Sequence, residues 1–203
     1  MKPARILFVT GTDTGVGKTV CAALATILLR QSGRRVAALK PICSGGRADA
    51  RLLHAAAGKV LRPDQVNPWH FRAALAPVLA ARKEKKRVRL REVAAHIRRM
   101  AKLFDVVIVE GAGGLLSPLG EDFDSRDLIQ ALDATPVIVC PNRLGAVNQV
   151  RLVMEALPRR IVRRARVILV DQAKPDAASH SNLQLLKEFV DPARLRTLPW
   201  LGR

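Results

Sequence analysis

The stretch "TGTDTGVGKT", Thr10 to Thr19, decides the fold of this chain. It follows the apolar run Ile6–Val9 and precedes the apolar-rich segment Val20–Leu29. A strand, a glycine-rich turn and a helix in this order form a loop that can hold phosphate groups. The usual spacing is G-x-x-x-x-G-K-[ST], but here Thr12 stands at the first position and the nearest glycine, Gly11, lies one residue further back. The sequence therefore predicts a phosphate-binding loop of unusual length.

Three glycines suit this loop to phosphate. Gly11, Gly15 and Gly17 can adopt backbone angles closed to other residues, so that successive amide N–H groups point inward at phosphate oxygens. Lys18 would then reach the β- and γ-phosphates, and the Thr19 hydroxyl would bind Mg²⁺. The pattern indicates binding of a nucleoside triphosphate.

The rest of the chain alternates short apolar runs with helical segments. We expect strands at 5–10, 35–40, 105–110, 136–140, 166–171 and 195–198, and helices at 18–31, 49–57, 89–103, 125–132, 146–157 and 179–189. Continuous apolar strands joined by helices predict a mostly parallel sheet covered on both faces. We therefore expect one domain, residues 1–203, with the three-layer α/β P-loop NTPase fold.

Composition narrows the function classes. The net charge of +18 could indicate a nucleic-acid partner, but aromatic residues make up only 3% of the chain, too few for base stacking. The densest basic cluster, Arg82–Glu92, runs into apolar positions and favours a linker followed by a solvated helix face. Three scattered cysteines predict reduced, mostly buried thiols. With no apolar run long enough to span a membrane and no signal peptide, we expect a cytoplasmic protein without a membrane partner.

Charged residues gather where predicted strands end, the usual ligand edge of an open parallel sheet. Glu110 ends an apolar strand directly before "GAGG", which favours it as a Mg²⁺ ligand. Asp49 lies near a helix start, where an acidic residue is also a common cap. Lys40 ends another strand and indicates that a second anion is bound, although a lysine there is often only solvated. Spacing alone leaves the roles of Asp49 and Lys40 open.

Six motifs in register resemble the dethiobiotin synthetase family. They are "VTGTDTGVGKT", whose phosphate loop has this family's longer form, and "LKPICSGG", "NPWHFRAALAP", "VEGAGGLLSPL", "RLGAVNQ" and "LPWL". Together they extend over nearly the whole chain. The resemblance implies ATP-dependent closure of the cyclic urea of dethiobiotin from diaminopelargonic acid and CO2. A carbamate and a mixed carbamic-phosphoric anhydride are the implied intermediates, and a homodimer is the implied assembly.

The same resemblance implies a set of site residues. It makes Lys18, Lys40 and Thr14 catalytic, with Lys40 on the carbamate and the transferring phosphate, and makes Thr19, Asp49 and Glu110 the Mg²⁺ ligands. Thr14 and Ser44 contact the substrate, whose carboxylate meets Leu144, Gly145 and Asn148 of the other subunit. The implied ATP contacts are Asp13, Gly15, Val16, Gly17, Lys18, Thr19, Val20, Asp49, Glu110, Gly111, Ala112, Gly113, Asp171, Gln172, Pro199, Trp200 and Leu201.

Asp171 departs from the family pattern. The family places Asn-Asp after the fifth strand, with the Asn reading adenine, and this chain has Asp171-Gln172. An ionised carboxylate only accepts hydrogen bonds, whereas an amide also donates. Two guanine donors could therefore face Asp171, which predicts weak discrimination, with GTP or CTP used within about tenfold of ATP. The alternative is that Asp171 turns outward and backbone groups near Trp200 select the base.

Two other functions are compatible with a phosphate loop. A partitioning-ATPase-like switch that binds nucleic acid would suit the positive charge, but "DTGVGKT" lacks the additional loop lysine of those proteins. An amide-forming ligase of cobalamin synthesis would carry a Cys/His glutaminase domain, which does not follow here. Both readings are weaker than the synthetase.

Overall fold

A six-stranded parallel sheet forms the centre of the computed structural model, which describes residues 4–202. Its strand order is β2-β5-β1-β6-β7-β8, and every neighbouring pair is parallel. The strands are β1 (Arg5–Gly11), β2 (Val36–Leu39), β5 (Val106–Glu110), β6 (Thr135–Pro141), β7 (Arg166–Val170) and β8 (Leu195–Leu198). All six predicted strands are present, and β1 lies between β5 and β6, so the loop that follows β1 is central.

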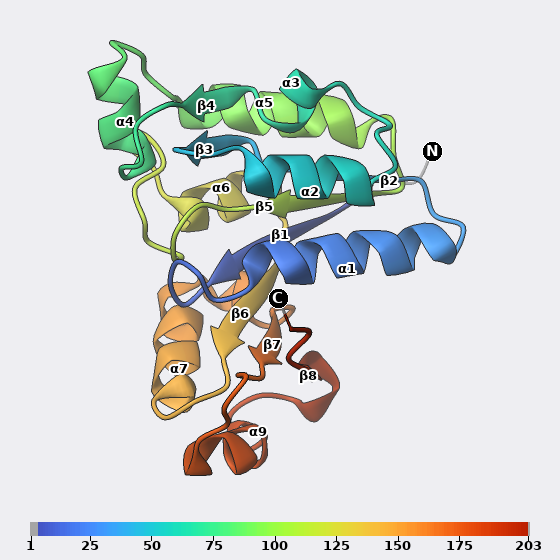
Figure 1. The fold of residues 1–203 in the computed structure, drawn as a ribbon, viewed down its shortest axis with the longest axis vertical. Coiled ribbons are helices and arrows are strands. Elements are labelled where there is room, and N and C mark those ends of the chain that lie inside the picture. Colours follow the sequence, from blue (N-terminus) through green and yellow to red (C-terminus); the bar gives the residue numbers. More distant parts are fainter. Residues whose placement is uncertain (1–3, 203) are drawn as a thin grey trace.

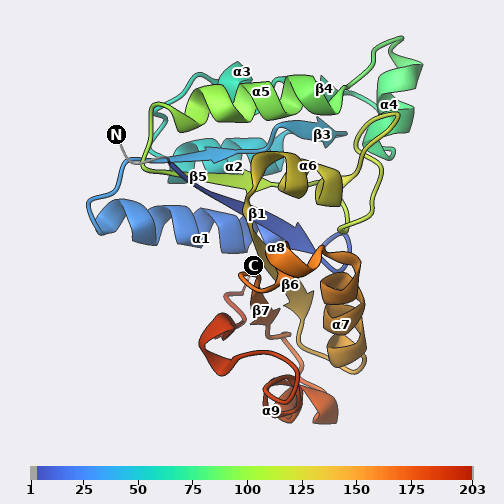
Figure 2. The ribbon, with the colours of Figure 1, turned by 180° about the vertical axis from the view of Figure 1, so that it is seen from behind.

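The two faces of the sheet carry two separate apolar cores. Along β5, Val107 and Val109 belong to one core, and Val106 and Ile108 belong to the other, because successive side chains of a strand point to opposite faces. Helices cover both faces, with α1 (Lys18–Gln31) and α2 (Ala48–Ala56) in front of the sheet in Figure 1, and α5 (Leu90–Ala101), α6 (Ser125–Leu132) and α8 (Arg159–Val162) in front of it in Figure 2. The helix α7 (Ala146–Ala156) packs on the core that contains Val107 and Val109. This confirms the predicted three-layer arrangement.

A second, two-stranded parallel sheet follows β2. It pairs β3 (Ile42–Ser44) with β4 (Trp69–Phe71), and α3 (Pro63–Val66) and α4 (Pro77–Lys83) flank β4 in the chain. None of these four elements was predicted from the sequence. β3, β4 and α3 have only three or four residues, and α4 has seven, so each is too short to have a readable period. Backbone bonds from Lys40 N to Val66 O and from Trp69 N to Pro41 O tie this sheet to the end of β2.

The C-terminal quarter differs from the prediction. The helix expected at 179–189 is only partly present, because a short α9 (Asn182–Leu186) lies within this range and a 3-10 turn η1 (Ala177–His180) precedes it. The Asp176 carboxylate accepts from Ser179 N and caps the 3-10 turn, and the Asn182 side chain turns back to Asn142. A further 3-10 turn, η2 (Pro192–Arg194), leads into β8.

Two further expectations concern the cysteines and the length of the helices. All three cysteines are buried and free, as predicted. Among residues 4–202, no helix has both the length and the apolar character required to cross a membrane.

Candidate functional site

The phosphate loop lies between β1 and α1, and its geometry requires glycine. Gly15 and Gly17 have φ angles of 73° and 95°, in the left-handed region that favours glycine. Gly11 is constrained by space instead, because a Cβ there would lie 2.6 Å from Val16 Cγ2. The helix α1 begins immediately after Gly17, so its first amides face the same space as the loop.

Lys18 is buried beneath the loop. Its Nζ donates to the Asp13 carbonyl at 2.5 Å. Burial and, after it, the nearby charge of Lys40 lower the pKa of Lys18 from 10.5 to about 8, although the negative charge of Glu110 acts in the opposite direction. An anion held in the loop would act in the opposite direction and favour the charged lysine.

Glu110 is the centre of a buried polar cluster. Only 1% of it is exposed, and its Oε1 accepts from the Thr19 hydroxyl at 2.8 Å and from Lys40 Nζ at 2.6 Å. Lys40 also donates to the Gly111 carbonyl at 2.9 Å. The other oxygen, Glu110 Oε2, is buried and has no hydrogen-bond partner within residues 4–202. An unpartnered carboxylate oxygen is costly in a protein interior, so a ligand that satisfies it is expected.

The oxygens around Glu110 fit a magnesium ion. Asp49 lies in the first turn of α2, and its half-exposed carboxylate is 3.4 Å from Lys40 Nζ. Mg²⁺ prefers oxygen ligands and is usually held by one or two carboxylates together with substrate phosphates. Thr19, Asp49 and the free oxygen of Glu110 supply this donor set beside the phosphate loop.

Asn67 fixes the backbone that carries Lys40. Its side chain is 1% exposed, and its Nδ2 donates to the Lys40 carbonyl at 2.7 Å. Its Oδ1 accepts from Arg47 Nε at 3.1 Å and from the Cys43 thiol at 3.3 Å. Asn67 thus joins the end of β2 to the segment that leads into α2. This bonding of Asn67 to the Lys40 backbone was not predicted from the sequence, although Asn67 is the first residue of one of the six quoted motifs.

A single cavity of about 1060 Å³ collects most of the expected site residues. It is lined by Thr14, Gly15, Gly17, Lys18, Thr19, Val20, Lys40, Ser44, Asp49, Glu110, Ala112 and Gly113. Its lining also includes residues to which sequence reasoning assigned no role, namely Cys43, Gly46, Ala48, Leu52, Leu75, Ala76, Pro77, Ser117 and Pro118. Several of these residues lie within the quoted motifs. The motifs therefore identified the correct segments of the chain but gave no role to these individual residues.

Other expected residues lie outside this cavity. Asp13, Val16 and Gly111 belong to the segments that frame it but do not line it. Ser44, which does line it, donates to the Leu75 carbonyl at 2.5 Å, so its hydroxyl hydrogen is already engaged.

The end of β7 adjoins the phosphate loop from the other side. The Val170 side chain is 3.4 Å from where a Cβ on Gly17 would lie. Asp171 and Gln172 follow it, both partly buried, and Asp171 Oδ1 accepts from Asn142 Nδ2 at 2.8 Å. After β8, Pro199, Trp200 and Leu201 are exposed. The structure thus brings the end of β7 beside the loop. It also adds Asn142, which was not predicted from the sequence.

The start of α7 presents an exposed turn. Leu144 is 76% exposed, Gly145 has a φ of 87°, and Asn148 is exposed. The Leu144 amide already donates to Asp176 Oδ2 at 2.7 Å. A carboxylate that binds here would therefore rely on the following amides and would have Asp176 as a neighbour.

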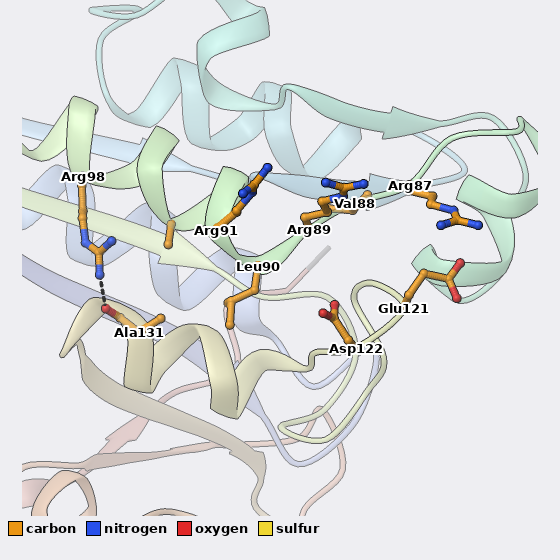
Figure 3. A pocket seen from close by; sticks show the side chains of 10 residues that line it. Arg87, Val88, Arg89, Leu90, Arg91, Arg98, Glu121, Asp122 and Ala131 are labelled. Carbon is orange, nitrogen blue, oxygen red and sulfur yellow. Dashed lines mark hydrogen bonds between the residues drawn. The ribbon is translucent and has the colours of Figure 1, made fainter.

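A second cavity, of about 680 Å³, lies between α5, α6 and the loop at Glu121 (Figure 3). Arg87, Arg89, Arg91 and Arg98 line it together with two acidic residues, and Arg98 donates to the Ala131 carbonyl at the end of α6. It shares no lining residue with the first cavity. Much of the basic cluster thus lies at the start of α5.

Comparison with known proteins gives consistent results. A protein-family model described as an AAA domain matches residues 5–203. The ATP-dependent dethiobiotin synthetase of Anaeromyxobacter dehalogenans (strain 2CP-C) is 39% identical over 201 residues, which cover 97% of this chain and 90% of the relative. The ATP-dependent dethiobiotin synthetase of Bacillus licheniformis is 34% identical over 200 residues, which cover 96% of this chain and 85% of the relative.

Solved structures support the fold. The signal recognition particle receptor FtsY from Elizabethkingia anophelis superposes with a TM-score of 0.59 at 16% identity, and the match covers all of this chain and 60% of that one. At this identity the likeness concerns the fold alone, and it confirms the predicted P-loop NTPase fold.

Proposed function

The chain belongs to the family of ATP-dependent dethiobiotin synthetases, and we propose how its residues carry out the reaction of that family. The reaction joins carbon dioxide and the two amines of diaminopelargonic acid into the cyclic urea of dethiobiotin. The observation that supports this proposal best is the pair of buried lysines, Lys18 and Lys40, which lie beside the Thr19–Glu110 bond in one cavity. Two cations suit a reaction in which two anions meet.

The bond changes define what the site must do. One amine of the substrate adds to carbon dioxide and loses a proton, which gives a carbamate. A carbamate oxygen attacks the γ-phosphorus, and the bond from that phosphorus to the bridging oxygen of ADP breaks. The second amine then attacks the carbamate carbon, the carbon–oxygen bond to the phosphoryl group breaks, and phosphate leaves as the ring closes and a proton is lost. Negative charges approach each other in the second step, so fixed cations favour it.

The two lysines divide this task. Lys18 follows the glycines of the loop and is proposed to hold the β- and γ-phosphates of ATP. Lys40 lies at the end of β2, where Glu110 and the Gly111 carbonyl fix its ammonium, and it is proposed to face the carbamate and the transferring phosphoryl group. A cation fixed before the reaction stabilises developing charge without reorganisation.

Three residues are proposed to hold Mg²⁺, namely Thr19, Asp49 and Glu110. When bound, the metal would supply positive charge that stabilises the phosphate oxygens. The free oxygen of Glu110 supports this assignment. The charge of the metal would also offset that of Glu110, so that the buried carboxylate need not repel the phosphates.

The substrate is proposed to occupy the rest of the cavity, near Thr14 and Ser44. Leu144, Gly145 and Asn148 do not line this cavity and are exposed at the start of α7. Their exposure supports a homodimer in which this turn meets the substrate of the partner subunit. A cytoplasmic location is part of the proposal because the reaction consumes ATP.

Phosphate release from ATP tests the function. Diaminopelargonate and bicarbonate are each omitted in turn, and dethiobiotin is quantified in parallel. We expect release only when both are present, in step with dethiobiotin. Equal release without either would contradict a synthetase and favour the nucleotide switch, which the comparisons do not favour.

A further inference from the structure

Asn67 is a buried side chain to which the proposed reaction assigns no role. It is 1% exposed and does not line the cavity of about 1060 Å³, whereas Lys40 and Asp49 do. A substrate in that cavity does not reach Asn67. Any effect of Asn67 on the reaction must therefore pass through the residues to which it is bonded.

The backbone of Lys40 is held at both of its polar groups. Its N–H donates to the Val66 carbonyl at 3.0 Å, and its carbonyl accepts from Asn67 Nδ2 at 2.7 Å. Within residues 4–202, this carbonyl has no other hydrogen-bond partner. Because a buried carbonyl needs a partner, the Asn67 amide fixes the point from which the Lys40 side chain extends. Glu110 and the Gly111 carbonyl fix the ammonium at its other end.

The oxygen of the same amide is bonded to Arg47, the residue that precedes α2. Arg47 Nε donates to Asn67 Oδ1 at 3.1 Å, and Arg47 Nη2 donates to the Asn67 carbonyl at 3.0 Å. The Asp64 carboxylate, 3.4 Å from Arg47 Nη2, is 90% exposed and therefore a weak anchor. Asp49 lies in the first turn of α2. The bonds to Asn67 thus fix the start of the helix that carries Asp49.

The partners of the Asn67 amide determine its orientation. Nδ2 faces the carbonyls of Lys40 and Pro41, and Oδ1 faces the Arg47 guanidinium and the Cys43 thiol. A flipped amide would place its oxygen against the two carbonyls and its nitrogen against the guanidinium. One amide therefore links the end of β2 to the start of α2.

We propose that Asn67 is a positioning residue for the reaction. Its amide nitrogen positions Lys40, and its amide oxygen, through Arg47, positions Asp49. The inference rests on the proposed function, in which Lys40 faces the transferring group and Asp49 binds Mg²⁺. A misplacement of about 1 Å in a site of this kind can lower the rate by about a hundredfold. A purely structural asparagine would instead affect folding alone.

Asn67→Asp and Asn67→Ala test the positioning of Lys40. Both lose the donor to the Lys40 carbonyl, whereas an aspartate keeps acceptor oxygens for Arg47 and Cys43. With all substrates saturating, kcat should fall by about tenfold or more in both variants. The dissociation constant of ATP in EDTA should change by less than about threefold, because the phosphate loop and Lys18 do not contact Asn67.

Urea unfolding shows whether each variant is folded under the assay conditions. A folded variant with normal kcat would overturn the role of Asn67, even if its unfolding midpoint falls. Affinity for ATP in EDTA that falls as much as kcat would mean a general disturbance of the cavity and would also overturn it. If Asn67→Ala does not fold, Asn67→Asp decides.

Arg47→Met tests the positioning of Asp49 by a measurement of binding. Titration calorimetry gives the ratio of the ATP dissociation constants in EDTA and in Mg²⁺, which reports how much the metal contributes. The ratio should fall by about tenfold in Arg47→Met, which loses both bonds to Asn67, and should stay near the wild-type value in Asn67→Asp. An unchanged ratio in Arg47→Met would overturn this half of the proposal. These titrations need no ring closure, so a wild-type protein that forms no dethiobiotin would contradict the proposed function separately.

Arg51→Met is the matched control. Arg51 lies one turn after Arg47 on α2, is exposed, and makes no side-chain hydrogen bond or ion pair within the described part of the chain. Its substitution removes the same charge from the same helix, so kcat and the ratio should stay at their wild-type values. A ratio that falls as much in Arg51→Met as in Arg47→Met would show that charge is responsible, and the proposed positioning of Asp49 would fail.

Discussion

A double-mutant cycle on Lys40 and Glu110 tests the buried cluster directly. The two side chains meet at 2.6 Å, and 5% and 1% of them are exposed. Lys40→Met keeps most of the length of the side chain and removes its charge. Glu110→Gln keeps the shape and removes the opposite charge. The double variant removes both charges at once.

The structure predicts that the two substitutions are strongly coupled. In Lys40→Met, Glu110 stays buried with only the Thr19 hydroxyl on Oε1 and no partner on Oε2. Leaving a buried charge without its partner costs about 3–5 kcal/mol, out of a total of about 5–15 kcal/mol for a typical domain. Glu110→Gln should cost less, because Lys40 retains the Gly111 carbonyl and Asp49. The double variant removes both charges of the pair, so its cost should be smaller than the sum of the two single costs by about 2 kcal/mol or more.

Urea unfolding of the four proteins in EDTA measures the cycle, since EDTA keeps Mg²⁺ from replacing the lost charge. Unchanged slopes against urea would show that the free energies are comparable. A coupling below about 0.5 kcal/mol would mean that the two charges do not depend on each other. The pair would then be solvated in solution, and its assignment as a fixed catalytic arrangement would fail.

Three further predictions concern the lysines and the surface charge. Lys18→Ala should weaken ATP binding. Lys40→Ala should mainly lower turnover, by a factor equivalent to about 2.7–4 kcal/mol of lost transition-state stabilisation. Normal turnover of Lys40→Ala with saturating substrates would show that Lys40 is not catalytic. The pKa of Lys18 is lowered from 10.5 to about 8, so the unfolded chain binds more protons between these values. The free energy of unfolding of the ligand-free protein should therefore rise with pH across that window relative to Lys18→Met, and parallel profiles would refute it. The charge of +18 should not produce tight duplex DNA binding, and nanomolar binding at physiological salt in a gel-shift titration would revive the nucleic-acid switch.

The fold was readable from sequence where a pattern was local. The central strands are buried on both faces, so runs such as "VVIV" in β5 are continuous and easy to recognise. The strands β3 and β4 are only three residues long and depend on pairing with each other across 27 positions, which no local pattern reveals. The helix expected at 179–189 is shorter than predicted for a related reason. Asn182 uses its side chain to bind Asn142, 40 residues away, and the local apolar pattern carries no sign of that contact.

The site residues likewise fall into those that a local pattern identifies and those that only the folded structure identifies. Lys18 and Thr19 belong to a contiguous motif, and Glu110 ends a strand at the ligand edge, so sequence reasoning could name them. Asn67 and Asn142 act through side-chain bonds to Lys40 and Asp171, which are 27 and 29 positions distant. An asparagine directly after a strand or a helix is usually interpreted as a turn residue. Only the folded arrangement distinguishes these two from ordinary turn residues.

The two lysines explain how the site can be prepared for phosphate before it binds. Folding buries Lys18 and Lys40, and desolvation followed by the charge of Lys40 lowers the pKa of Lys18 although nearby carboxylates act in the opposite direction. The ligand-free protein therefore contains an unfavourable interaction between two buried cations, which the favourable burial of the two apolar cores offsets. A bound triphosphate would reverse its sign, because the anion lies between two cations that are already desolvated and oriented. Binding then need not provide the free energy for bringing the cations together, and Lys40, fixed by Glu110 and Asn67, is in place when charge develops on the transferring group.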